Sequence, residues 1–194
     1  CAMKDPNPAV NGAGIQKLQQ AGIEVQSGLM TAEAEELNAG FLMRMRQQRP
    51  WVRVKLAQSM DGHVALANGS SQWISGPQAR ADVQDWRARS DVILTGVGTV
   101  LADNPSLNVR NNDNARQPLR VIVDSHWRTP ANAGLLSLPG AVLIAGLRDV
   151  PVPAELAGSV AECMPFAAED GRVSLPAVLS ELGKRGLNEI QVEA

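Results

Sequence analysis

The stretch that decides the fold is DVILTGVGT at residues 91–99, where a short apolar run leads directly into two closely spaced glycines. The run at residues 92–94 has no polar side chain, which is typical of a strand covered on both faces in a parallel sheet. Glycines after such a strand let backbone amides approach a phosphate closely. The stretch therefore predicts an α/β domain. It leaves residues 96–99 open to two interpretations: a ligand loop, or a plain turn from strand to helix.

This glycine stretch satisfies neither standard nucleotide-binding motif. Leu101 stands where the dinucleotide fingerprint requires its third glycine, and no lysine follows as in a P-loop. Further along, residues 103–106 and Arg110 place a carboxylate, an amide, a hydroxyl and a guanidinium in one short segment. That segment is either a site for an anionic ligand or a capped surface turn.

Apolar runs alternate with helical patterns in the second half of the chain. Strands are predicted at residues 119–123, 141–144 and 189–192, with a helix at residues 175–184 before the last of them. Strands that alternate with helices indicate an α/β domain. A chain of 194 residues is expected to form one main core with an appendage.

Before the glycine stretch, an alternating strand is predicted to begin at Trp51. Its alternate apolar residues would face the core, with Arg53 and Lys55 on the polar face. Turns at residues 60–62 and 68–69 then predict a hairpin-like course. By spacing alone, Lys55 is either a solvated edge lysine or a proton donor in a cleft.

A helix is predicted to open at Ser75-Gly76-Pro77, because proline suits the first helical position. The expected buried stripe of this helix consists of Ala79, Val83 and Trp86. A polar row is expected at Arg80, Gln84 and Arg87. Arg87 and Arg110 each have a fork that can bind phosphate through two N–H groups. Arginines on a helix face and in a loop are more often surface charges, so both interpretations stay open.

Composition argues against several classes of protein. The chain is 44% hydrophobic with a net charge of −2, and it contains four tryptophans, two phenylalanines and no tyrosine. Neither a basic field nor a ring platform for nucleic acid is present. No run approaches the roughly 18 apolar residues of a membrane span, and Cys1 and Cys163 form no paired motif. We expect a cytoplasmic protein with a small-molecule partner, and neither a nucleic acid nor a membrane partner.

Metal and hydrolase chemistry also lack their signatures. The two histidines, His63 and His126, have no cysteine cluster or acidic motif at ligand spacing, so both are expected to be structural or exposed. No serine lies in a Gly-x-Ser-x-Gly turn. From the residues alone, the sequence therefore predicts an anion-binding α/β domain with no metal site.

Ordered motifs along nearly the whole chain resemble one known family. They are MKDPNP at residues 3–8, KLAQSMDG at 55–62, GSSQWI at 69–74, TVLADNPSL at 99–107 and VDS at 123–125. Their order resembles the bifunctional riboflavin biosynthesis family, in which a pyrimidine deaminase is fused to a uracil reductase. Met60 stands where leucine is usual in that family.

The resemblance implies a fold and a domain boundary. The implied α/β fold is a dihydrofolate-reductase-like mixed sheet flanked by helices, preceded by the C-terminal remnant of a cytidine-deaminase-like domain. Residues 1–48 would form that remnant and a linker helix. Residues 49–194 would form a reductase domain that is incomplete at its C-terminal end. Zinc is expected only in the deaminase region upstream of Cys1, and a glycine-rich cofactor loop is expected downstream of Ala194.

The resemblance also implies the site residues. Lys55 and Asp103 would be catalytic, since together they would hold and protonate the opening sugar ring. The implied NADPH contacts are Ala57, Trp73, Thr99, Asp103 and Ser125. The implied substrate contacts are Ser71, Arg87, Leu107, Arg110 and Glu193. Arg87 and Arg110 would bind the ribose phosphate, because a planar fork suits a dianion.

The implied reaction is the NADPH-dependent reduction of the ribosyl group of 5-amino-6-(5-phosphoribosylamino)uracil to ribityl, carried out by a homo-oligomer. Two other interpretations are weighed against it. One is a non-catalytic phosphate-binding or assembly module of the same fold. The other is a folate reductase, which would need an acidic residue in the first helix that this sequence does not place.

Overall fold

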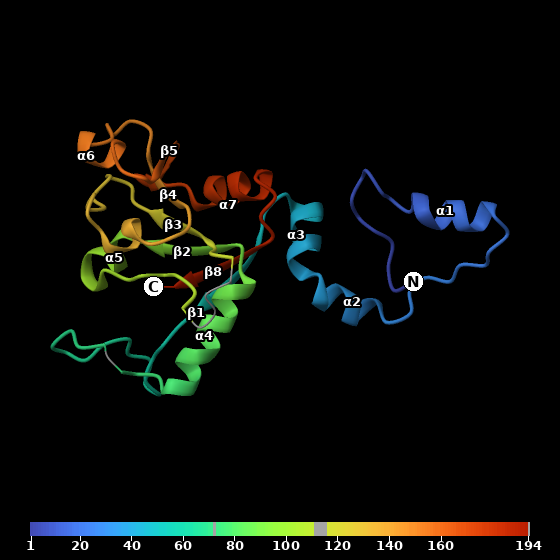
Figure 1. The fold of residues 1–194 in the computed structure, drawn as a ribbon, viewed down its shortest axis with the longest axis horizontal. Helices are drawn as coiled ribbons and strands as arrows, with labels where there is room; N and C mark the ends of the chain where they lie inside the picture. Colours follow the sequence, from blue (N-terminus) through green and yellow to red (C-terminus); the bar gives the residue numbers. More distant parts are fainter. Residues whose placement is uncertain (72, 111–115, 194) are drawn as a thin grey trace. The chain divides into compact units, whose positions relative to one another are not determined.

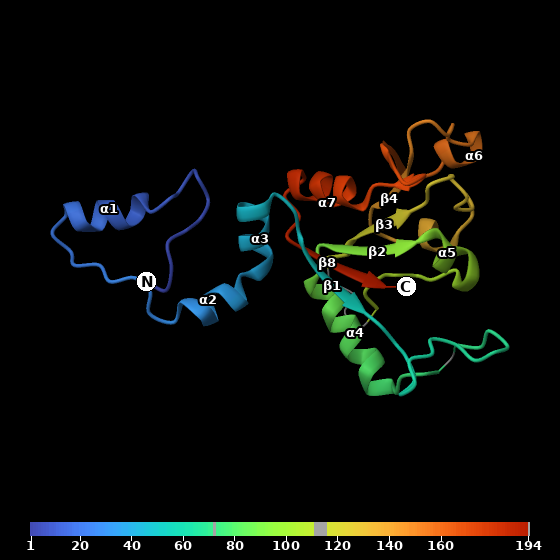
Figure 2. The same ribbon diagram turned by 180° about the vertical axis from the view of Figure 1, so that it is seen from behind.

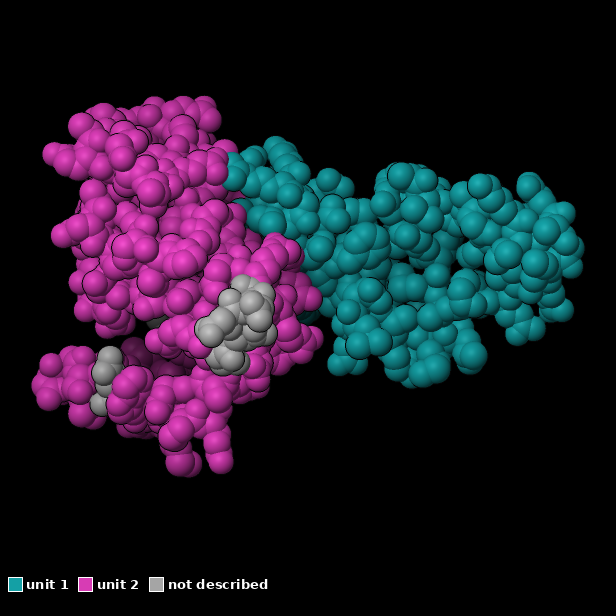
Figure 3. All heavy atoms as spheres, in the orientation of Figure 1, with its two compact units in different colours: residues 1–51, 180–188 teal, residues 52–179, 189–194 magenta. Residues whose placement is uncertain are grey.

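The computed structural model describes residues 1–71, 73–110 and 116–193. The chain forms two compact units, which are coloured separately in Figure 3. Unit 1 comprises Cys1–Trp51 and Ser180–Asn188, and unit 2 comprises Val52–Leu179 and Glu189–Ala194. Every residue implied to bind cofactor or substrate falls in unit 2.

A six-stranded sheet forms the centre of unit 2 (Figures 1 and 2). Its order is β1 (Trp51–Lys55), β8 (Glu189–Glu193), β2 (Val92–Gly96), β3 (Leu119–Val123), β4 (Val142–Leu147) and β5 (Glu162–Phe166). The ladders that join β8, β2, β3, β4 and β5 are all parallel. The predicted strands at residues 92–94, 119–123 and 189–192 are thus confirmed, and the one predicted at residues 141–144 lies at β4. β8 pairs beside β2 although it comes last along the chain.

Helices flank this sheet, as expected for the α/β fold. They are α4 (Pro77–Arg89), α5 (Val97–Asp103), the 3-10 helix η1 (Gly134–Ser137), α6 (Ala154–Ala157) and α7 (Leu175–Lys184). A small antiparallel pair, β6 (Ala168–Glu169) and β7 (Arg172–Val173), precedes α7. The mixed α/β architecture with a mostly parallel central sheet confirms the predicted fold class.

The apolar core lies where α5, η1 and α6 cover β3 and β4. Ile122 and Ile144 on the strands pack with Val100, Leu135 and Leu156, and all five are at most 2% exposed. Branched aliphatic side chains fit such a doubly covered parallel sheet. The core fixes the carboxyl ends of β2 and β3 at one edge of the sheet, because their ladder runs from Val92–Leu119 to Gly96–Val123.

The predicted inward face of β1 is wrong. Val54 and Leu56 are each 60% exposed, whereas Arg53 and Lys55 are half-buried. The guanidinium of Arg53 lies 3.9 Å from the ring centre of Trp86 on α4, a cation–π contact that covers the charged face. The strand is at the edge of the sheet, and Val54 and Leu56 on its apolar face are exposed to solvent.

The predicted orientation of α4 is also wrong. Gln84 and Arg87 from the expected polar row are only 8% and 7% exposed, and Ala79 from the expected buried stripe is exposed. Arg87 from this row bonds Glu193 on β8, and Gln84 accepts from the backbone N–H of Arg110. Hydrophobic periodicity carries no information about such partners, because they come from other parts of the chain.

The hairpin-like course before α4 is confirmed only in its turns. Backbone bonds from Gly62 N–H to Ser59 and from Gly69 N–H to Leu66 close the two turns, at 2.9 and 2.8 Å. No strand joins them in the described residues 56–71 and 73–76. The segment is therefore a loop that leads from β1 into α4, and Gln72 lies outside the described residues.

Unit 1 contains α1 (Ala13–Gln20), α2 (Thr31–Leu37) and α3 (Ala39–Gln47). A Cβ added to Gly183 would lie 2.5 Å from the carbonyl oxygen of Gln48, so only glycine allows this close approach. Arg44 Nε donates to Asn188 Oδ1 at 2.7 Å. Across the described parts of the chain, no helix has the length and apolarity needed to span a bilayer.

Candidate functional site

A polar cavity of about 270 Å³ lies in unit 2 at the junction of β1, the loop before α4, α4 itself, the end of α5 and the end of β8. Eight of the residues implied by the family resemblance line it: Lys55, Ala57, Ser71, Trp73, Arg87, Asp103, Arg110 and Glu193. These residues are spread over more than 130 positions of the sequence. The fold thus brings most of the expected site together in one place.

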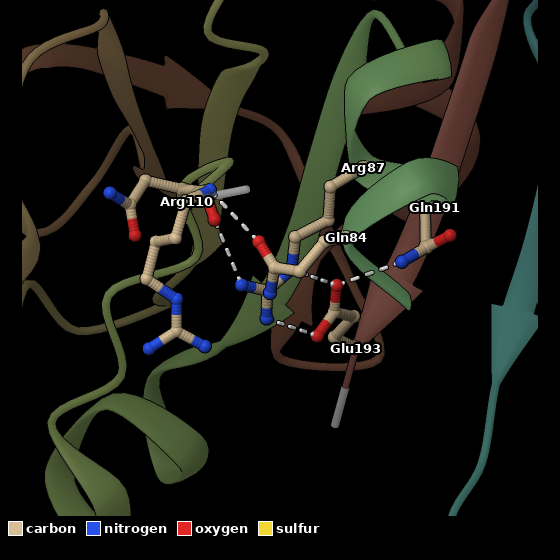
Figure 4. A network of polar contacts seen from close by, with 6 residues as sticks. Gln84, Arg87, Arg110, Gln191 and Glu193 are labelled. Atoms are coloured by element: carbon tan, nitrogen blue, oxygen red, sulfur yellow. Dashed lines mark hydrogen bonds and ion pairs between the residues drawn. The ribbon is translucent and has the colours of Figure 1, made fainter. Parts of the chain in front are cut away.

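The best-defined contact in the polar cavity is a buried ion pair between α4 and β8 (Figure 4). Arg87 donates from Nε and Nη2 to the two carboxylate oxygens of Glu193, each at 2.7 Å, and both side chains are 9% exposed. Gln191 Nε2 donates to Glu193 Oε1 at 2.8 Å. Bidentate geometry and a third donor are what a buried carboxylate needs to remain charged.

The charge state of Glu193 follows from these partners. Burial alone would raise the pKa of Glu193, but the hydrogen bonds and charge of Arg87, with smaller contributions from Gln191 and Lys55, hold that pKa below its ordinary value. Glu193 is therefore a carboxylate near neutral pH. Since Lys55 contributes to this shift, its ammonium group acts electrostatically on the same carboxylate.

Two arginines in the polar cavity differ in what their guanidinium groups contact. The Arg87 guanidinium donates to both carboxylate oxygens of Glu193 and, from Nη1, to the carbonyl of Asn108 at 3.0 Å. Among the described residues, the Arg110 guanidinium has no hydrogen bond or ion pair, and only its backbone N–H is bonded, to Gln84 Oε1 at 3.0 Å (Figure 4). Arg110 is thus the arginine that is free to bind an added anion.

The loop before α4 is held to the cavity by Arg80, a residue for which the sequence predicted only a place in a polar row. Its guanidinium donates to the carbonyl of Ser75 at 2.5 Å and lies 4.3 Å from the ring centre of Trp73. Trp73 itself is 71% exposed. Arg80 therefore fixes an exposed ring beside the cavity through a cation–π contact.

A larger cavity of about 940 Å³ lies at the carboxyl ends of β2 and β3. Gly96, Val97 and Gly98 line it, so the glycine stretch is at once a turn from strand to helix and the wall of a cavity. Ser125 lines the same cavity, together with His126, Arg128 and Arg172. Its position at the carboxyl edge of a parallel sheet is where ligands of α/β folds bind.

The polar groups of this larger cavity fit an anionic cofactor. No hydrogen bond or ion pair of the Arg128 and Arg172 guanidinium groups occurs within the described residues. Thr95, which lines the cavity and is fully buried, has no partner for its hydroxyl in the same part of the chain. Buried hydroxyls without partners are rare, so the Thr95 hydroxyl is an unusual feature of this cavity wall.

The remaining predicted residues lie on α5 and just after it. Thr99 and Asp103 are one helical turn apart, and Asp103 reaches the polar cavity while Gly98, beside Thr99, lines the larger one. Leu107 has a left-handed backbone (φ 51°) and is 2% exposed. It does not line either cavity but leads into the segment that carries Arg110.

Sequence reasoning missed several cavity residues. His126 is exposed, as expected, but it lines the larger cavity; Arg128 and Arg172 line it too. Gln84 and Arg80 line the polar cavity. Their position in one polar row on α4 was the signal that the sequence offered, and pattern alone left the role of that row open.

In charge, the polar cavity is suited to a multiply negative ligand. Four cationic side chains line it, Lys55, Arg80, Arg87 and Arg110, against the carboxylates of Asp103 and Glu193. A cavity with such an excess of positive charge attracts a phosphate ester. The α/β fold and the cationic side chains that line the two cavities are suited to small anionic ligands.

Comparison with known proteins identifies the family. The model of the RibD C-terminal domain matches residues 50–194, and the chain belongs to this family. The riboflavin biosynthesis protein RibD of Escherichia coli is 43% identical over 205 aligned residues, which cover 100% of this chain and 55% of that protein. The chain spans about half the length of the curated relatives it matches.

Solved structures agree with this assignment. Acinetobacter baumannii RibD is 41% identical with a TM-score of 0.85, covering 100% of this chain and 53% of that one. A Thermotoga maritima protein, described as a diaminohydroxyphosphoribosylaminopyrimidine deaminase/5-amino-6-(5-phosphoribosylamino)uracil reductase, is 30% identical. Its TM-score is 0.83, over 100% of this chain and 52% of that one.

Proposed function

We propose that this chain carries out the NADPH-dependent reduction of the ribosyl group of 5-amino-6-(5-phosphoribosylamino)uracil to ribityl. The observation that carries the proposal is the meeting, in one cavity, of eight residues from distant parts of a RibD-family sequence. In the reaction, the bond between C1 and the ring oxygen of the ribose breaks, the oxygen takes a proton, and C1 takes a hydride. The reduced nicotinamide would supply that hydride.

Within this proposal, Arg110 binds the phosphate of the substrate, because its guanidinium is free and lines the polar cavity. Arg87 acts on the substrate through Glu193, whose carboxylate it holds in place. Ser71 and the segment after Leu107 complete the substrate contacts. This division refines the expectation that both arginines bind the phosphate directly.

Lys55 and Asp103 are proposed to handle the proton. They line the polar cavity from β1 and from the end of α5. Lys55 is a donor and Asp103 is an acceptor that can orient a sugar hydroxyl or the lysine. The ammonium group of Lys55, which acts electrostatically on the Glu193 carboxylate, can give a proton to the ring oxygen.

The proposed cofactor site extends from the larger cavity to the polar one. Ser125 lines the first, Ala57, Trp73 and Asp103 line the second, and Thr99 lies on the helix between them. NADPH is proposed over NADH because Arg128 and Arg172 offer two free guanidinium groups to a phosphate.

We also propose the domain boundary near residue 48. Residues 1–48 are then the end of a deaminase domain with a linker helix, and residues 49–194 are reductase. A zinc site would belong to the deaminase domain of the whole protein. A cytoplasmic homo-oligomer is proposed for the whole protein on the same grounds of family membership.

The test is anaerobic NADPH oxidation by the full-length protein with the phosphoribosylamino-uracil as substrate. Substrate-dependent oxidation is expected, and Arg110→Ala should lower kcat/KM at least about tenfold through a higher KM. Arg44→Ala is a matched control, because Arg44 lies in unit 1 and lines neither cavity. A well-folded wild type that oxidises no NADPH would instead favour a non-catalytic phosphate-binding module.

A further inference from the structure

The segment that carries Arg110 is held by side chains rather than by a strand ladder. Asn108 gives its carbonyl to Arg87, and Arg110 gives its backbone N–H to Gln84 Oε1, each at 3.0 Å. Between them, Val109 bonds at both backbone groups to the amide of Gln117, at 2.9 and 3.1 Å. Three consecutive residues are therefore each tied to a side chain from elsewhere in unit 2.

These ties have a physical reason. Residues 108–110 belong to no helix or strand, and Val109 is only 4% exposed, so their backbone groups need partners that a sheet does not provide. The side-chain amide of Gln117 supplies both an acceptor and a donor to Val109, as the backbone of a neighbouring strand would. Gln84 supplies a single acceptor from α4, and it is itself buried at 8% exposure.

Only one of the two glutamines acts on Arg110 directly. Gln84 bonds Arg110 itself and lines the polar cavity, whereas Gln117 bonds Val109 and does not line it. A long arginine side chain loses much rotamer freedom when it binds a ligand. A hydrogen bond that fixes the backbone N–H of Arg110 restricts the backbone conformation there, and therefore the directions in which the Arg110 side chain can project.

We propose that Gln84 is a positioning residue that anchors the backbone of Arg110, so that the free Arg110 guanidinium is presented to a phosphate monoester in the polar cavity. The inference rests on the proposed function only in the choice of ligand. Gln84 supplies no group to the reacting atoms. Its contribution is to lower the cost of ordering Arg110 when the phosphate binds.

The role of Gln84 can be tested without turnover by measuring the binding of ribose 5-phosphate to the full-length protein with titration calorimetry. Gln84→Met keeps the length of the side chain and removes the acceptor. It should weaken binding about three- to tenfold, the effect of one hydrogen bond. Arg110→Ala should weaken it more. In the Arg110→Ala background, Gln84→Met should have no further effect, because Gln84 acts through Arg110.

Turnover provides a second readout. Gln84→Met should raise KM for the phosphorylated substrate and leave KM for NADPH and kcat nearly unchanged, whereas a general loosening of the fold would change all three. If Gln84→Met does not fold, Gln84→Asn, which is one methylene shorter and out of reach of the Arg110 N–H, takes its place.

Two results would overturn the proposal: wild-type affinity for ribose 5-phosphate in Gln84→Met, or an equal loss of affinity with and without Arg110. Absence of ribose 5-phosphate binding by the wild type would overturn it as well. Binding that follows the predicted pattern in a protein without reductase activity would sustain the role of Gln84 and reject the proposed reaction.

Discussion

The centre of the sheet and the contact between α4 and β8 are built on opposite principles. On β3 and β4, Ile122 and Ile144 are fully buried among other aliphatic side chains. On α4 and β8, a second buried layer consists of Arg87, Glu193 and their polar neighbours. The first layer is stable with any well-packed apolar set, whereas the second is stable only when each charge has its partner.

The two layers differ in their relation to the cavity. The apolar layer fixes the sheet and the edge at which the strands end. The polar layer lies beside the cavity and holds charged groups at fixed positions. Charges that are buried together cost free energy to desolvate, so their retention points to a purpose other than stability alone.

The largest expected effect on the free energy of unfolding comes from removing one partner of the ion pair in the polar layer. Glu193→Ala leaves the Arg87 guanidinium buried without its carboxylate, and it should lower the free energy of unfolding by about 3–5 kcal/mol. Urea unfolding of the full-length protein measures this. The double variant Arg87→Met/Glu193→Leu should recover most of the loss. A double variant as unstable as the single one would mean that the charge itself is not the cause.

The ion pair between Arg87 and Glu193 should also make the stability of the protein depend on pH. The pKa of Glu193 is lowered in the folded protein, so its contribution to stability is present above the ordinary glutamate pKa and is lost as pH falls through the folded value. Stability should therefore fall between about pH 5 and about pH 3 more steeply in the wild type than in Glu193→Gln. Urea midpoints at both pH values test this, and parallel curves would contradict it.

A conservative change in the apolar layer should cost less. Ile144→Val removes one methylene from a fully buried site and should lower the free energy of unfolding by about 0.5–1.5 kcal/mol. NADPH oxidation per folded molecule should stay at the wild-type level, because Ile144 lines neither cavity. A loss of activity without loss of stability would contradict the view that the apolar layer acts only through stability.

The smallest effect is expected at an exposed ion pair. Arg116 Nη2 lies 3.2 Å from Asp91 Oδ1, but the Arg116 side chain is 73% exposed. Arg116→Ala should change the free energy of unfolding by at most about 1 kcal/mol, since solvent screens such pairs. The same urea assay compares it with Glu193→Ala. Equal losses would show that burial does not decide what an ion pair contributes here.

The same contrast explains what the sequence could predict. The strand at residues 92–94 and those at 119–123 and 189–192 were predictable, because continuous apolar runs report burial directly. The bounds of α7 were predictable as well. The inward face of α4 was not, because a polar row becomes buried only when distant partners such as Glu193 lie opposite it. For β1, a charged face covered by Trp86 reversed the predicted burial.

The candidate site divides in the same way. Pattern alone left Lys55, Arg87 and Arg110 open between surface charges and a site, and only ordered motifs singled them out. Their meeting in one cavity depends on β8 pairing between β1 and β2, a long-range pairing that no local pattern contains. Gln84 was missed because its partner is a backbone N–H, which every residue but proline has.

One measurement tests the central claim most directly: reduction of the phosphoribosylamino-uracil by the full-length protein with NADPH deuterated at C4 of the nicotinamide. We expect a ribityl product that carries one deuterium at C1, seen as a mass increase of about one unit in the sugar fragment, as direct hydride transfer requires. Two results would contradict the account. One is a ribityl product that lacks deuterium whichever face of the nicotinamide was labelled, and the other is the absence of any ribityl product.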